Sequence, residues 1–307
     1  MSTSKGIFNF FYSFLLSKKT KHKSETIIVS IAIISFLLHL IIIGLAHFKL
    51  VHLSNSSNLL NNPIAAIYTP FSFILIYEVY LLVYYLPRST TIYIAKQYEI
   101  ITLIVIRRVF KDLSKLEFTA DWFKVNNDLH FTYDLVATIL LFFMIYIFYK
   151  LNDQRVLTLK ADKDPTAEIA AFIKMKNIVA MLLIPIFLIL AVYSLGRWVI
   201  DNFFSITQLV GNIKDVNKIF FDDFFTILIL IDVLLLLFSF FHTNKFNKVI
   251  RNSGFIISTI LMKLSFGAEG LLNTILIVVA VLFGVLILLI HNQYEKIIVK
   301  DDPIEIA

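Results

Sequence analysis

The chain contains no cysteine, and this absence excludes several kinds of chemistry. Without a thiol there is no disulfide, no iron–sulfur cluster, no cysteine-ligated zinc and no thiol catalysis. The sequence also lacks a Walker loop, a GxGxxG string, an HExxH string, a GxSxG elbow and a TVGYG filter string. We therefore expect no cofactor and no metal site. We also expect no enzyme activity, with an intramembrane enzyme kept as an alternative.

Charged residues are scarce as well. Only 16% of the 307 residues are charged, whereas 58% are hydrophobic. Soluble domains are usually about 45–50% apolar and about 25% charged. Together with a mean hydropathy of +0.81, both departures indicate that lipid is the solvent. The net charge of +6 then fits basic loops against anionic headgroups, so no nucleic-acid partner is expected.

Long apolar runs are abundant, and a helix needs about 20 mostly apolar residues to cross a bilayer. Clear candidates for such spans are 26–48, 64–86, 131–149, 178–200, 221–241 and 270–291. Two weaker candidates are 90–109, which contains Lys96 and Glu99, and 254–268, which contains Lys263. We predict an all-α bundle of eight transmembrane helices. Six spans with two interfacial or re-entrant helices is the alternative.

Basic residues indicate how the spans are oriented. With eight spans, most lysines and arginines and both termini fall on one side, whereas segment 49–63 on the other side holds only Lys49. This distribution matches the excess of positive charge on cytoplasmic loops, although the basic segment 107–130 does not fit it. The Ile-, Asn- and Lys-rich composition suggests a bacterial cytoplasmic membrane as the location.

The two halves of the chain resemble one another. Residues 71–86 align with 225–240, and residues 100–110 align with 256–266. The predicted organisation is therefore an interfacial N-terminus, two parallel four-helix units joined by a cytoplasmic linker, and a cytoplasmic tail. The ranges of these parts are 1–25, 26–150, 151–177, 178–291 and 292–307. Chance similarity between Ile-, Leu- and Phe-rich segments is the alternative.

Two acidic residues lie inside long apolar stretches. These are Glu78, within 71–86, and Asp232, within 225–240. A carboxylate in the hydrocarbon region costs several kcal/mol unless it is paired, hydrated or protonated. Each is therefore a candidate site for a cation or a proton. The alternative is a buried contact that only holds helices together.

Basic residues nearby are candidate partners for these acids. Lys96 and Glu99 lie three positions apart, so they share a helix face that Arg107 continues. Glu78 is a natural partner for Lys96 or Arg107, and Lys263 could pair with Asp232. Alternatively, 90–109 is an amphipathic helix on the membrane surface, and the long side chain of Lys263 extends to the interface.

These residues define two classes of function. In the first, the protein is an ion channel or transporter whose buried carboxylates, paired with basic residues, handle a cation or a proton. In the second, it is a membrane scaffold whose buried ion pairs are structural. Its loops 107–130 and 150–177 would then bind protein partners or a second copy of the chain. The lipid bilayer is a partner in both cases.

Overall fold

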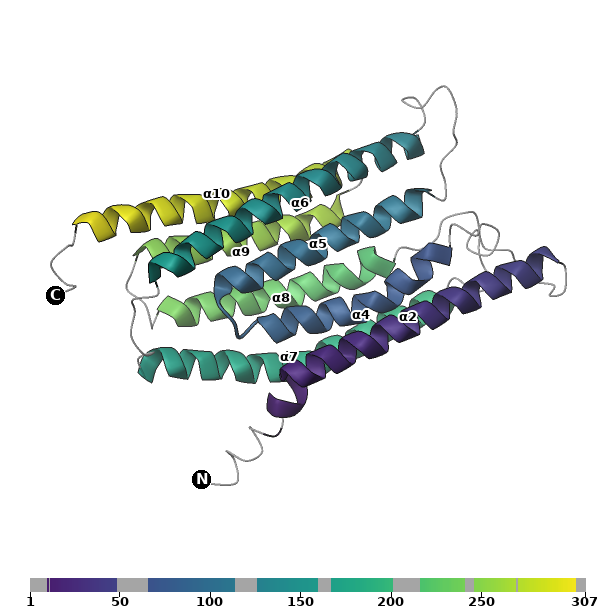
Figure 1. Cartoon of the computed structure of the whole chain (residues 1–307), viewed down its shortest axis with the longest axis horizontal. Helices are drawn as coiled ribbons and strands as arrows, with labels where there is room; N and C mark the ends of the chain where they lie inside the picture. The colour runs from purple at the N-terminus through teal and green to yellow at the C-terminus, as the bar shows by residue number, and fades with distance from the viewer. Residues whose placement is uncertain are drawn as a thin grey trace.

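The computed structural model describes residues 10, 12–48, 66–113, 126–159, 167–200, 216–240, 246–268 and 270–301. All long elements in these ranges are helices, and no strand occurs among them. Figure 1 shows the helices lying side by side along one direction. They are α2 (Lys18–His47), α4 (Tyr68–Tyr85), α5 (Thr90–Leu113), α6 (Asn126–Leu159), α7 (Ala167–Val199), α8 (Val216–Phe240), α9 (Phe246–Gly267) and α10 (Leu271–Asp301).

Five of the described helices are long and apolar enough to cross a membrane. These spans are Tyr12–His47, Asp128–Gln154, Ala171–Arg197, Phe246–Gly267 and Leu271–Ile297. In α4 and α8 the apolar stretches found among the described residues, Thr69–Tyr85 and Phe224–Phe238, are shorter. Helix α5 carries several charged residues and is not in this group. A multi-pass membrane protein is therefore supported. The prediction of eight spans is not confirmed, because five of the described helices qualify as candidate spans.

The helices extend beyond the apolar runs that predicted them. Helix α6 continues to Leu159 and α7 begins at Ala167, so most of the predicted linker 151–177 is helical and only 160–166 lie outside the described residues. Likewise, of the predicted loop 107–130, only 114–125 lie outside them. The apolar pattern marks the part of a helix that contacts hydrocarbon, whereas its polar ends can extend into headgroups and water.

The segment before the first long helix contacts the bundle through a hydrogen bond to α4. Of the predicted interfacial segment 1–25, residues 12–15 are helical and residues 18–25 belong to α2, while before residue 12 only residue 10 is described. Ser17 then adopts an extended backbone, and its side chain accepts a hydrogen bond from the backbone N–H of Thr20 at 3.1 Å, which begins α2. The hydroxyl of Tyr80 on α4 donates to the carbonyl of Leu15 at 2.9 Å.

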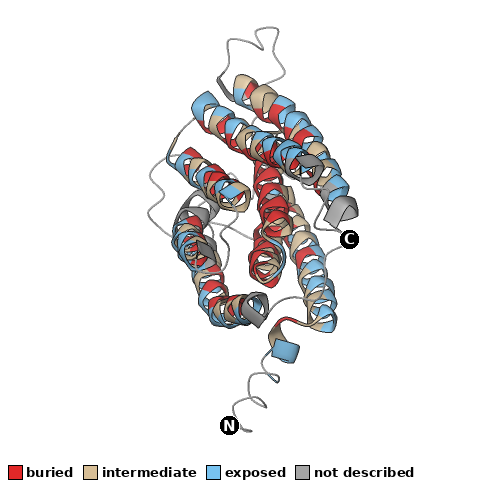
Figure 2. Cartoon of the chain, turned by 90° about the vertical axis from the view of Figure 1, so that its left-hand side faces the viewer, coloured by how far each residue is buried: buried red, intermediate tan, exposed pale blue. Residues whose placement is uncertain are grey.

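Helix contacts arrange the bundle as two rings that share one edge. Going round, α4, α5, α9, α8 and α7 each contact the next, and α7 contacts α4 again. We call this the five-helix ring. Helices α5, α6, α10 and α9 form the second ring, and α2 packs against α4. In Figure 2, buried residues are concentrated on helices in the middle of the bundle, while the outer helices show exposed faces.

The exposed faces of the outer helices are largely apolar. Representative exposed side chains are Ile33 on α2, Phe143 on α6, Leu182 on α7 and Ile290 on α10. Soluble monomers rarely expose continuous apolar surface on this scale. Helices in contact with lipid are expected to have such apolar faces, because contact with hydrocarbon tails carries no free-energy penalty for an apolar side chain.

Glycine allows helices to approach closely at the centre of the second ring. Gly284 on α10 faces Tyr98 on α5, whose hydroxyl lies 2.9 Å from the hydroxyl of Ser258 on α9. Ser258 in turn donates to the carbonyl of Ala280 at 2.6 Å. A Cβ atom at Gly284 would overlap the Tyr98 hydroxyl. The absence of a side chain at this position therefore lets three helices meet.

Replacing Gly284 with alanine is expected to destabilise the protein by about 1–3 kcal/mol, because the added methyl group overpacks this contact. The midpoint of thermal unfolding in detergent measures the effect. Gly196→Ala is the matched control, since nothing lies within 4 Å of a Cβ atom there and alanine is the better helix former. Equal midpoints for Gly284→Ala and wild type would show that these helices are not packed this closely.

Candidate functional site

A pocket lies inside the five-helix ring. Its lining comes from all five helices: Leu86 directly after α4, Thr90, Tyr93 and Ile94 of α5, Phe172 and Lys176 of α7, Asp232, Leu235 and Leu236 of α8, and Asn252, Phe255 and Ile256 of α9. The cavity volume is about 50 Å³. A water molecule needs about 10–15 Å³ of such volume, so the pocket has room for a few waters.

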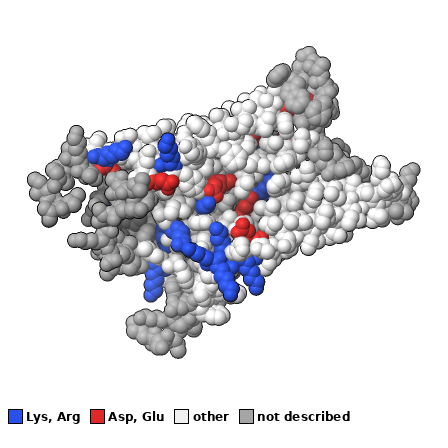
Figure 3. Space-filling view, viewed as in Figure 1, with Lys and Arg blue, Asp and Glu red and all other residues white. Residues whose placement is uncertain are grey.

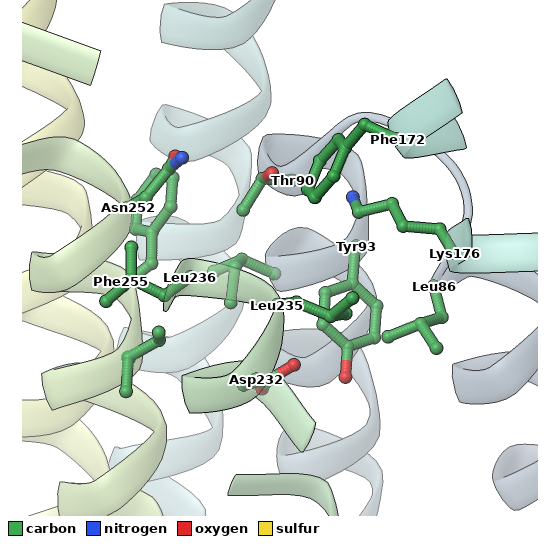
Figure 4. Close-up of a pocket in the computed structure, with 12 residues that line it drawn as sticks. Leu86, Thr90, Tyr93, Phe172, Lys176, Asp232, Leu235, Leu236, Asn252 and Phe255 are labelled. Atoms are coloured by element: carbon green, nitrogen blue, oxygen red, sulfur yellow. The ribbon is translucent and has the colours of Figure 1, made fainter. Parts of the chain in front are cut away.

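The pocket lies towards one end of the bundle. Thr90 is the first residue of α5, and Lys176 and Asn252 lie in the early turns of α7 and α9. Asp232 is deeper, eight residues before the end of α8 at Phe240, which is about 12 Å along the helix. In Figure 4, the Asp232 carboxylate and the Tyr93 hydroxyl lie together, and the polar ends of Lys176 and Asn252 lie away from them.

The Asp232 carboxylate is held by a short chain of hydrogen bonds. The side-chain N–H of Gln97 on α5 donates to Asp232 Oδ2 at 3.2 Å. The Oε1 atom of Gln97 accepts from the hydroxyl of Thr259 on α9 at 2.8 Å. Gln97, Thr259 and Asp232 are all buried. The chain fixes the orientation of the amide, so that its donor side faces the carboxylate.

Asp232 has no ion-pair partner. Within the described part of the chain, no lysine or arginine lies within salt-bridge distance of it, although Lys176 lines the same cavity. The Lys176 ammonium group donates to the backbone carbonyl of Arg88 at 3.2 Å and lies 5.4 Å from the Phe172 ring centroid. A buried carboxylate and a buried ammonium group therefore line one small cavity without direct contact.

Tyr93 adds a polar group with no hydrogen-bond partner. Its hydroxyl is buried beside Asp232 and Gln97, but within the described structure it makes no hydrogen bond of ordinary geometry with either. A buried hydroxyl without a partner costs about 1–3 kcal/mol. Such a group is commonly satisfied by ordered water, and the adjacent cavity has room for it. The inner end of the pocket is thus suited to hold water against a carboxylate.

A layer of phenylalanine side chains lies further along the five-helix ring. Phe187 of α7 is 4.6 Å from Phe224 of α8 between ring centroids, and Phe225 is 5.3 Å from Phe266 of α9. Phe224 and Phe225 are themselves 5.4 Å apart. All four side chains are buried. Because they lie on the side of Asp232 away from the pocket, we call them the aromatic plug.

Glu78 and Arg107 form a buried ion pair between α4 and α5. Their side chains are only 3% and 1% exposed, and neither lines the pocket. Of the two partners that the sequence suggests for Glu78, the structure has Arg107 and not Lys96. The pair satisfies two charges in the interior but is separate from the cavity that Asp232 lines.

Lys96 and Glu99 form a second, more exposed pair. The Lys96 ammonium group lies 2.7 Å from Glu99, and the two side chains are 23% and 34% exposed. Leu103, one turn further along, is 40% exposed. On the helix face shared by Lys96, Glu99 and Arg107, only Arg107 is fully buried, and the first two side chains are partly exposed. Tyr85 of α4 and Tyr149 of α6 cover Lys96 on this side.

The expected pair between Asp232 and Lys263 does not form. Asp232 contacts Gln97, which is bonded to Thr259, so Thr259 marks the level of Asp232 on α9. Lys263 lies four residues beyond Thr259, or about 6 Å further along the helix, and is half-buried. A shift of one helical turn is enough to replace an ion pair with an amide contact.

A further polar cluster joins four helices at the other end of the bundle. Arg108 of α5 pairs with Asp134 of α6 at 3.0 Å, and Thr274 of α10 donates to Asp134 at 2.7 Å. Asn273 accepts from Arg108 and donates to the carbonyl of Ser265 on α9 at 2.5 Å. Sequence reasoning missed this cluster because Arg108 fell in a predicted loop. The sequence did contain one indication of the cluster, since Asp134 is an acidic residue inside the apolar span 131–149.

Sequence reasoning did not single out Tyr93 and Lys176, which line the pocket, or Thr259, which holds Gln97 in place. No group of three or more His, Cys, Asp or Glu side chains among the described residues could hold a metal ion. Comparisons of the chain with protein-family models, characterised proteins and solved structures found no match. The function is therefore inferred from the geometry of the pocket.

Proposed function

We propose that this chain is a multi-pass membrane protein that moves a proton or a small cation through the five-helix ring, with Asp232 as the group that accepts it. One observation carries the proposal. A buried carboxylate without an ion-pair partner lies at the inner end of a cavity with room for water, inside a ring of apolar helices.

The electrostatics of the pocket support this role. A carboxylate in a medium of low dielectric constant attracts a cation or a proton far more strongly than it would in water. The single N–H donor from Gln97 compensates only part of its charge. Lys176, across the cavity, adds a positive charge that competes for the same carboxylate. Uptake at Asp232 and the approach of Lys176 would then exclude one another.

The aromatic plug supplies the second element of a transport cycle. It separates Asp232 from the far end of the ring with buried aromatic rings, which give a passing ion no polar contact. Hydrophobic constrictions of this kind close pathways by excluding water. The arrangement supports a state in which Asp232 is accessible from one end, and release to the other end requires the plug to part.

Helix contacts support the proposal of two four-helix units. In the first half α2 contacts α4, α4 contacts α5 and α5 contacts α6; in the second half α7, α8, α9 and α10 contact one another in the same order. Four helices per unit would bring each unit back to its starting side, so two such units would be parallel; Figure 1 shows α2 and α7 beginning on the same side. The contact of α4 with α7 joins them.

The pocket end is proposed to be cytoplasmic. Helix α2 begins, and α10 ends, on the side of the bundle where the termini are marked in Figure 1, which is also where α5, α7 and α9 begin. Lys18, Lys19 and Arg88 lie there and are exposed. An excess of lysine and arginine is the usual mark of the cytoplasmic side.

A structural role without transport is the second candidate. The Glu78–Arg107 pair and the Arg108–Asp134 cluster favour it, because both satisfy buried charges away from the pocket. In that case the polar interior would specify helix packing, and the protein would serve as a membrane scaffold for protein partners or a second copy of itself.

Flux in proteoliposomes tests the choice. Vesicles containing purified protein are expected to pass protons, or one of Na⁺ and K⁺, above the rate of empty vesicles when a voltage is imposed. Glu99→Gln is the matched control, since Glu99 lies on α5 outside the pocket; its flux should equal that of wild type. Absence of flux from folded wild-type protein for all three ions would contradict the proposal and favour the scaffold.

A further inference from the structure

A group of basic side chains lies where α2 begins and α4 ends. It consists of Lys18, Lys19, Lys21, Lys23 and Arg88, which we call the basic patch. Figure 3 shows lysine and arginine side chains gathered on this face of the molecule. Lys18, Lys19, Lys23 and Arg88 are exposed, and Lys21 is half-buried. The side chains of the patch do not line the pocket of Asp232, so the patch is a separate site from the one proposed for transport.

Two cations of the basic patch share one aromatic ring. The Lys21 ammonium group lies 5.7 Å from the centroid of the Tyr84 ring, and the guanidinium carbon of Arg88 lies 5.6 Å from the same centroid. Lys21 also donates to the hydroxyl of Tyr85 at 3.1 Å. Cation–π contact and this hydrogen bond therefore position both groups.

The positive charges of the basic patch are only partly offset by the protein, since Glu25 lies close enough to Lys21 to attract it. Within the described part of the chain, none of its five members forms an ion pair with a carboxylate. The nearest acid along the chain, Glu25, accepts from the Tyr77 hydroxyl at 3.2 Å and lies 3.9 Å from His22. An anion that contacts both Lys21 and Arg88 would be attracted by both positive charges.

Apolar side chains next to the basic patch indicate which kind of anion fits. Phe10 and Phe14 are exposed and stack with ring centroids 6.3 Å apart, directly before the lysines in the chain. Ile27 and Ile31, on α2 just after them, are exposed too. A free phosphate ion gains nothing from contact with apolar side chains, whereas a phospholipid carries acyl chains that can pack against them. Tyrosines are also typical of the headgroup level of a membrane.

We propose that Lys21 and Arg88 bind the phosphate of an anionic phospholipid headgroup, with Tyr84 holding the two cations in place. Arginine presents paired N–H donors that match phosphate oxygens, and lysine adds a compact point charge. The remaining lysines of the patch raise the local concentration of anionic lipid. The acyl chains lie against the exposed apolar residues of α2 and the segment before it.

Thermal unfolding of the full chain in mixed micelles tests this site. Micelles contain detergent with either phosphatidylglycerol, which is anionic, or phosphatidylcholine, which is zwitterionic; a third arm contains phosphatidylcholine with inorganic phosphate. The wild type is expected to unfold about 2–4 °C higher with phosphatidylglycerol, because a ligand of the folded state stabilises it. The double variant Lys21→Gln/Arg88→Gln should lose at least half of this rise.

The control variant is Arg197→Gln. Arg197 lies in the last turn of α7, 5.8 Å from the Tyr193 ring, and so repeats the cation–π contact at the opposite end of the bundle. It should keep the full rise. Equal midpoints in the two lipids, an equal rise with inorganic phosphate, or a full rise in the double variant would each overturn the proposal. The midpoint of each variant in phosphatidylcholine shows whether it is folded.

Discussion

Replacing Glu78 with leucine is expected to destabilise the protein by about 3–5 kcal/mol. The change leaves the guanidinium group of Arg107 buried without its carboxylate, and an uncompensated charge in the interior costs this much. Arg107→Leu should cost a similar amount for the converse reason. Unfolding of purified protein in detergent, monitored by circular dichroism against denaturant concentration, measures both.

The double variant Glu78→Leu/Arg107→Leu shows whether the two residues stabilise the protein as a pair or independently. Replacing both charges by apolar side chains is often neutral, so the double variant should recover most of the stability that either single variant loses. Glu99→Leu is the matched control, because its pair with Lys96 is partly exposed and such pairs contribute only about 0–1 kcal/mol. Additive losses in the double variant would show that the two residues do not act as a pair.

Unlike Glu78→Leu, Asp232→Asn is expected to abolish flux without lowering stability. Asparagine keeps an oxygen for the N–H of Gln97 but removes the charge that attracts a cation or a proton. Removing a buried charge that has no ion-pair partner also removes its desolvation cost. Flux in proteoliposomes should fall to the level of empty vesicles, while the unfolding midpoint stays equal to or above that of wild type.

The comparison of the two acids is informative in both directions. If Asp232→Asn kept wild-type flux, the pocket would not be the path of the ion. If Asp232→Asn instead unfolded as readily as Glu78→Leu, both carboxylates would be structural and the scaffold candidate would gain. Proteins commonly trade stability for function at active positions, and on this account Asp232 is such a position whereas Glu78 is not.

The helices could be predicted from apolar runs because hydrocarbon requires them to be long and continuous. All eight described helices overlap a predicted span, including α5, whose charges made it a weak candidate. The helix ends were less predictable. Residues past the apolar run of 131–149 remain helical to Leu159, since a helix can continue into headgroups and water with polar side chains.

The site was only partly predictable. Glu78 and Asp232 are recognisable as acids in apolar surroundings, but their partners depend on how the helices rotate and slide against each other. Gln97 is neutral and gave no electrostatic signal, yet it contacts Asp232. Lys176 lay in a predicted loop and proved to line the pocket from α7. The ring of five helices cannot be read from the order of spans, because it depends on contacts between distant helices.

Single-cysteine labelling tests most directly whether Asp232 lies in a membrane bundle with access from one end. The chain has no cysteine of its own, so each introduced thiol is the only one that reacts. Ser89→Cys marks the pocket end, Gly267→Cys marks the other end at a position with open space around it, and Leu236→Cys lies in the pocket. A charged, membrane-impermeant thiol reagent is applied to vesicles of each orientation.

The account predicts that Ser89→Cys and Leu236→Cys react in vesicles of one orientation and Gly267→Cys in vesicles of the other. Labelling of Leu236→Cys from the Gly267 side, or of Ser89→Cys and Gly267→Cys from the same side, would contradict it.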